Sequence, residues 1–86
     1  MSTEDFDKKI SQLQQLLDKN PNWNKQIPQP CAILKSIIAK GEDVDKEAKY
    51  GVLMQIQGDF LHCVRATNPD LASMSDEELL ETKLNE

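Results

Sequence analysis

Cysteine and histidine are scarce in this sequence of 86 residues, which contains two Cys and one His. Two cysteines are too few for a disulfide scaffold, and we therefore predict a reduced, cytoplasmic protein. One histidine and two distant cysteines also cannot build a zinc site. We expect neither a metal centre nor a cofactor.

Long apolar runs are also missing. The longest, Cys31 to Leu34, has four residues, whereas a bilayer crossing needs roughly 18–20. The opening residues, Met1 to Asp5, are acidic and polar, unlike the basic and then apolar start of a secretory signal. The sequence thus predicts no membrane span and no secretory signal.

Basic residues are nearly absent from the last part of the chain. Residues 66–86 contain Lys83 against six acidic residues, Asp70, Asp76, Glu77, Glu78, Glu81 and Glu86, and the net charge of the whole chain is −5. Nucleic-acid binding depends on clustered Lys and Arg, so we expect no nucleic-acid partner. A protein with a basic surface is a suitable partner for this acidic segment, and the alternative is that the acidity only maintains solubility.

The apolar residues recur with helical spacing in most of the chain. Phe6, Ile10, Leu13, Leu16 and Leu17 predict an amphipathic helix over Thr3–Lys19. The proline-rich stretch Asn22–Pro30 is typical of an ordered loop, and a second helix is predicted over Pro30–Lys40, ended by Gly41.

The longest predicted helix spans about Val44 to Ala66. Val52, Leu53, Ile56, Phe60, Cys63 and Val64 lie on one arc, which Tyr50, Met54 and Leu61 extend. Gly51 and Gly58 lie at the border of the polar face. Because a helical glycine costs about 1 kcal/mol against alanine, we expect a neighbouring backbone to pack close there or the helix to bend.

A short last helix is predicted from Ser75. Ser75 and Glu78 form a capping box, and Met74 and Leu79 form a hydrophobic staple. Its apolar residues are Leu79, Leu80 and Leu84. About ten residues are marginal as an isolated helix, so this helix either closes the bundle or becomes ordered on a partner. The predicted organisation is a helical core over 1–68 and an acidic segment with a short helix over 69–86.

No constellation of reactive residues stands out, and we predict that the protein is not an enzyme. His62 lies on the polar face of the longest helix without a nucleophile beside it, since Cys63 points about 100° away. Cys31 lies in the first turn of its predicted helix, where backbone N–H groups lower a thiol pKa, but the apolar neighbours of Cys31 favour simple packing.

Two short stretches resemble acyl-CoA-binding proteins, which are four-helix bundles of about this size. They are Phe6-Asp7-Lys8 and the segment from Lys46 to Tyr50, KEAKY. The tyrosine and lysine of that family's second helix have no counterpart in Cys31–Lys40. The resemblance implies, as the alternative function, a small helical carrier of an acyl or other apolar ligand.

The sequence therefore predicts an all-α bundle of three to four helices, with a long third helix and a short C-terminal one. A bundle this small cannot bury all its large apolar side chains, so we predict that some of them contact another protein or a second copy of the chain. An adaptor, regulator, inhibitor or helper subunit fits this pattern. The candidate contact residues are Trp23, Ile27, Tyr50, Met54, Leu61, Leu79, Leu80 and Leu84.

Overall fold

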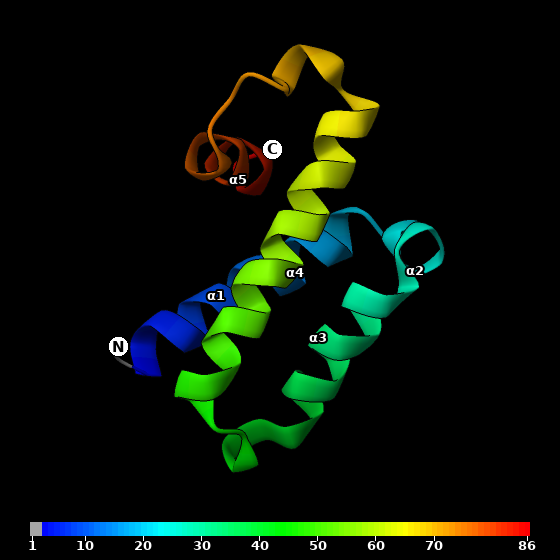
Figure 1. Ribbon diagram of the computed structural model, residues 1–86. Coiled ribbons are helices and arrows are strands. Elements are labelled where there is room, and N and C mark those ends of the chain that lie inside the picture. The colour runs from blue at the N-terminus through cyan, green and yellow to red at the C-terminus, as the bar shows by residue number, and fades with distance from the viewer. Residues whose placement is uncertain (1–2) are drawn as a thin grey trace.

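The computed structural model describes residues 3–86, which are 85% helical with no strand among them and confirm the all-α prediction. The helices are α1 (Thr3–Lys19), α2 (Trp23–Gln26), α3 (Pro28–Lys40), α4 (Lys46–Thr67) and α5 (Asp76–Leu84), with single 3₁₀ turns at Gly41–Asp43 and Pro69–Leu71 (Figure 1). No helix in this described part is long and apolar enough to cross a membrane.

The segment predicted as a loop is the main correction to the secondary structure. Between Asn22 and Pro30 the chain forms the short helix α2 and the first residues of α3. Proline fits the first turn of a helix because its missing N–H would have no intrahelical partner there, so α3 begins at Pro28 and includes Pro30. The predicted second helix was therefore two residues too short.

The longest helix, α4, begins two residues later than predicted. Val44 is extended, and Asp45 caps the helix because its side-chain Oδ1 accepts a hydrogen bond from the Ala48 backbone N–H at 3.2 Å. The capping places the first helical residue at Lys46. At the end of α3, Gly41 has a positive φ of 58°, a conformation that favours glycine.

The helices α1, α3 and α5 all pack against α4 (Figure 1). Their apolar faces form one core cluster, and its members are Phe6, Leu13, Leu16, Leu17, Trp23, Cys31, Leu34, Ile37, Leu53, Ile56, Phe60, Leu61, Val64, Leu79 and Leu80. Burial of these faces is the main stabilising contribution for helices that would be marginal alone.

The two helical glycines are not sites of close packing, which was one of the two explanations we expected for them. A β-carbon placed on Gly51 or Gly58 would meet no neighbouring atom within 4 Å. Both residues are exposed. The glycines lie toward solvent because α1, α3 and α5 cover the other faces of α4.

The last helix closes the bundle within the chain. The Ser75 hydroxyl caps α5 by accepting a hydrogen bond from the Glu78 backbone N–H at 3.2 Å. Leu79 is fully buried and Leu80 is 7% exposed. Both belong to the core cluster to which α1, α3 and α4 also contribute. The sequence left two alternatives for this helix, closure of the bundle or ordering on a partner. In the structure, α5 closes the bundle.

Two cations hold the ends of α5. At its start, the Arg65 guanidinium donates to the Met74 carbonyl at 2.8 Å and pairs with the Asp76 carboxylate at 2.7 Å. At its end, the Lys19 ammonium donates to the backbone carbonyls of Lys83, Leu84 and Glu86, at 3.1, 2.8 and 2.9 Å. A cation is favourable there because the last helical carbonyls lack intrahelical donors and carry partial negative charge.

Candidate interaction groove

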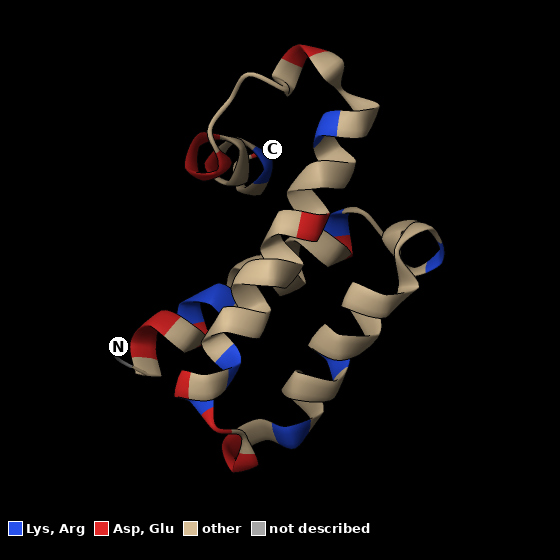
Figure 2. Ribbon diagram, viewed as in Figure 1, with Lys and Arg blue, Asp and Glu red and all other residues tan. Residues whose placement is uncertain are grey.

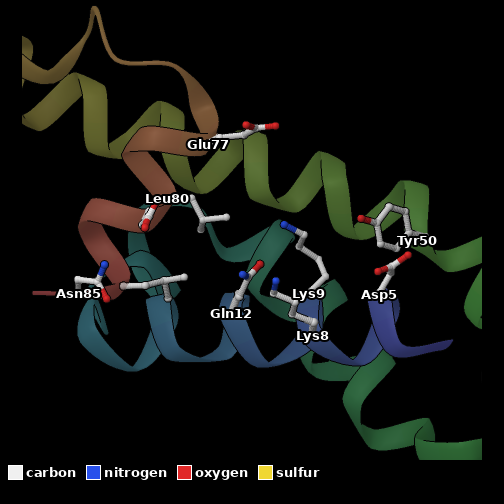
Figure 3. Close-up of a pocket in the computed structure, with 10 residues that line it drawn as sticks. Asp5, Lys8, Lys9, Gln12, Tyr50, Glu77, Leu80 and Asn85 are labelled. Carbon is white, nitrogen blue, oxygen red and sulfur yellow. The ribbon is translucent and has the colours of Figure 1, made fainter. Parts of the chain in front are cut away.

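A groove of about 540 Å³ lies between α1 and α5, beside the N-terminal part of α4 (Figure 3). We call it the α1–α5 groove. Its lining residues are Asp5, Lys8, Lys9, Gln12, Tyr50, Glu77, Leu80, Glu81, Leu84 and Asn85.

The α1 side of the groove is polar. Asp5, Lys8, Lys9 and Gln12 follow the spacing i, i+3, i+4 and i+7, which places them on one face of the helix. The sequence analysis did not select these residues. The signal was present as a polar row beside the apolar stripe of α1, but polar rows on helices usually face only solvent.

Lys9 is held in place by the core beneath it. Its ammonium donates a hydrogen bond to the side-chain carbonyl oxygen of Gln57, a polar residue that is only 5% exposed. Burial lowers the pKa of the Lys9 amino group below its ordinary value of 10.5, the adjacent Lys8 lowers it further, and Glu77 opposes the shift. The charge of Lys9 therefore has a defined position at the inner edge of the groove.

The α5 side combines acidic and apolar residues. Glu77 and Glu81 are one helical turn apart and are both exposed. Leu80 and Leu84 also line this side. The Tyr50 ring contributes from α4 (Figure 3). The groove thus has an α1 edge with one acidic and two basic residues, an acidic α5 edge, and an apolar strip made of Leu80, Leu84 and Tyr50.

The lining of the groove is mainly polar and charged. Five of the ten lining residues are charged and two carry amides, whereas small-molecule pockets are lined mainly by apolar and aromatic groups. Within residues 3–86 no three His, Cys, Asp or Glu side chains are grouped to hold a metal ion. His62 is exposed and is not part of the groove.

Cys31 is a packed core residue rather than an exposed thiol. It is 1% exposed, and burial raises the pKa of its thiol above the ordinary value of 9.0. Because α3 begins at Pro28, Cys31 lies a full turn into the helix, away from the free N–H groups of the first turn. Backbone N–H groups at a helix start would lower the pKa of the Cys31 thiol, but desolvation of the thiolate has the larger effect and raises it.

The predicted contact residues fall into three groups. Tyr50, Leu80 and Leu84 come together in the α1–α5 groove, although Leu80 is largely buried. Met54 is 41% exposed on α4. The others are core residues, fully buried (Leu61 and Leu79), 5% exposed (Trp23) or packed against the core (Ile27).

The sequence allows two interpretations of Trp23, an exposed anchor or a side chain folded back over the first two predicted helices, and in the structure Trp23 is folded back and buried. Its indole stacks on the Phe60 ring of α4, with the ring centroids 4.6 Å apart and the planes tilted by 32°. The short helix α2 makes this contact possible because it turns the indole inward. Burial of the indole removes a large aromatic surface from water and so stabilises the fold.

Comparisons of the chain with protein-family models, with curated proteins and with solved structures found no match.

Proposed function

We propose that this protein is a small helical interaction module that binds another protein through the α1–α5 groove. The observation that carries the proposal is the composition of the groove, in which charges of both signs surround the apolar side chains of Leu80, Leu84 and Tyr50. A protein segment supplies charged and apolar groups side by side, so it can match all three parts of this lining.

An acyl or other apolar ligand matches the groove less well. Such a ligand would leave the charged groups of Lys8, Lys9, Glu77 and Glu81 without water or partners where it covered them, and unpaired polar groups are costly to bury. The fully buried side chains, such as Leu13 and Phe60, fill the space between the helices. The carrier function is thus supported by no feature of the groove.

Exposed apolar surface next to the groove also supports protein binding. Tyr50 and Met54 are one turn apart on α4, and Met54 is 41% exposed. An apolar patch beside a polar rim is the usual anatomy of a transient protein interface.

Site-specific photocrosslinking in cells tests the proposal. A benzophenone amino acid replaces Gln12, which lines the groove, or Gln14, which is exposed on α1 and lies about 200° around the helix from Gln12. We expect a protein to be crosslinked from position 12 and not from position 14.

Equal crosslinking from both positions, or none from position 12, would exclude the groove as the contact surface. Organic extraction of the purified protein is the matching control for the carrier function. Recovery of a stoichiometric lipid would support the carrier instead.

A further inference from the structure

Another, smaller groove lies between α3 and α4, which are side by side, run in opposite directions and are joined through Gly41–Asp43 (Figure 1). We call it the α3–α4 groove. Its volume is about 180 Å³, and its lining residues are Gln29, Pro30, Ile33, Val52, Gln55, Ile56 and Asp59. None of them lines the α1–α5 groove, so the two grooves are separate surfaces of the molecule.

The α3–α4 groove exposes apolar side chains that the bundle itself does not cover. Ile33 is 39% exposed, and Pro30 and Val52 are only partly buried. Ile56 lines the same groove and belongs to the core cluster, so the exposed side chains continue directly from the core. Covering them would remove apolar surface from water, which favours association.

Charge is scarce on this face of a highly charged chain. Asp59 is the one charged residue among the seven that line the α3–α4 groove, whereas five of the ten residues that line the α1–α5 groove are charged. Residues 50–58 of α4 contain no charged residue, and Figure 2 shows this uncharged stretch beside α3. Depletion of charge is characteristic of the buried centre of a protein interface.

The polar groups of the α3–α4 groove can pair with their own kind. Gln29 and Gln55 are exposed, and neither side chain forms a hydrogen bond with another group of residues 3–86. A side-chain amide both donates and accepts hydrogen bonds, so the glutamines of one copy can bond to those of an identical face. The net charge of −5 makes much of the remaining surface repel a second copy, and the α3–α4 groove largely lacks that obstacle.

We infer that the α3–α4 groove is an interface between two copies of this chain. A two-fold axis relates the copies, and it places Ile33 and Val52 of each copy against the same groove of the other, with the amides of Gln29 and Gln55 beside them. Dimers of this symmetry are the commonest soluble oligomers. The inference goes beyond the proposed function, because it concerns another surface and a different partner.

The size of the face limits the strength of the dimer. Because α3 has 13 residues, it is about 20 Å long, and two adjacent helices are about 20 Å wide, so the footprint is about 400 Å² on each copy. A standard stable interface uses about 800 Å² on each partner. The dimer should accordingly be weak and depend on protein concentration.

The dimer leaves the α1–α5 groove open. Tyr50, which lines that groove, lies about 160° around α4 from Val52. Two copies therefore present two α1–α5 grooves, and a partner with two binding segments would bind more tightly through both grooves than through one.

Sedimentation velocity of the purified full chain tests the inference. A concentration series from about 10 μM to about 1 mM covers the range expected of an interface this small. We expect the wild-type protein to shift from monomer towards dimer across this range. Ile33→Glu places a carboxylate of each copy in the uncharged centre of the interface and should weaken dimerisation about tenfold or more.

Met54→Glu and Ile38→Glu are the matched controls. The two side chains are 41% and 36% exposed, and neither lines the α3–α4 groove. Met54 lies about 160° around α4 from Val52, and Ile38 lies about 140° around α3 from Ile33. Both substitutions make the same change in net charge as Ile33→Glu and should leave dimerisation unchanged. Circular dichroism checks that all three variants retain the fold.

Crosslinking of the purified chain locates the contact. A benzophenone amino acid at Gln55, which lines the α3–α4 groove, should give a covalent dimer on illumination. The same group at Gln14, which is exposed on α1, should not.

A wild-type protein that remains monomeric up to about 1 mM would overturn the inference. So would equal weakening by Ile33→Glu and either control, because another face would then be the interface. In cells, crosslinking of a different protein from position 55 without a covalent dimer would assign the groove to that protein and likewise overturn it. Photocrosslinking from position 12 does not depend on any of these results, so a failure of the dimer differs from a failure of the proposed function.

Discussion

Single residues in this protein take their properties from burial more than from their sequence neighbours. Cys31 and Cys63 both have thiol pKa values raised above 9.0, mainly because burial disfavours the thiolate, with Asp59 raising that of Cys63 further. The two cysteines are free thiols. A raised pKa reduces the thiolate fraction at neutral pH, and the thiolate is the reactive form.

We therefore predict slow alkylation of Cys31 in the folded protein. Treatment with iodoacetamide at pH 8, followed by mass spectrometry, should label Cys31 many times more slowly than in denaturant, and more slowly than the partly exposed Cys63. The rate should continue to rise as the pH passes 9.0, because the folded thiols ionise above that value. Equal rates with and without denaturant would show that Cys31 is accessible.

The glycines of α4 give a second prediction at the residue scale. Since a β-carbon at Gly58 would meet no neighbour within 4 Å, Gly58→Ala should stabilise the protein by about 0.5–1 kcal/mol through helix propensity. Urea denaturation measures this change. Gly41→Ala is the contrasting variant and should destabilise, because the positive φ of 58° is strained for alanine. Destabilisation by Gly58→Ala would indicate a packing role that the structure does not contain.

At the scale of the element, α5 depends on contacts outside itself. It has nine residues, and isolated helices of that length are marginal in water. Leu79 and Leu80 fix its inner face, while Arg65 and Lys19 bond to its two ends. One wall of the α1–α5 groove therefore exists only because these distant residues hold α5 in position.

Removal of the lysine at the C-terminal end of α5 should loosen this wall. We expect Lys19→Ala to increase hydrogen exchange of the last α5 amides, corresponding to a local loss of about 0.3–1 kcal/mol, because three backbone carbonyls lose their donor. Lys25→Ala, at an exposed position on α2, should leave the same amides unchanged. An unchanged exchange rate in Lys19→Ala would mean that the apolar contacts alone hold this end.

At the scale of the whole molecule, residues from 1–68 and from 69–86 share one hydrophobic cluster. Leu79 enters it from α5, and Trp23 and Phe60 stack within it from α2 and α4. A small domain with a single cluster usually unfolds in one cooperative step. The α1–α5 groove should therefore persist as long as the bundle does.

Thermal unfolding of the whole chain tests this cooperativity. Emission from buried Trp23 should be blue-shifted in the folded protein, and its loss should coincide with the loss of helical circular dichroism. Leu79→Ala should lower the stability by about 2–5 kcal/mol and shift both signals together, because it opens a cavity at a fully buried position. If the variant lost helix signal but retained the Trp23 transition, residues 69–86 would be an independently docked segment.

The sequence by itself determined the four longer helices, but not the short helix α2 or the first residues of α3 and α4. The spacing of apolar residues predicted α1 to the residue, and the Ser75 cap predicted the start of α5, because both signals depend on near neighbours in the chain. The edges and strip of the α1–α5 groove were decided only by the tertiary structure. Lys8 and Glu81 are far apart in the chain and become opposite edges only when α1 and α5 pack on α4. No local pattern records that packing, since it depends on the combined fit of several apolar faces.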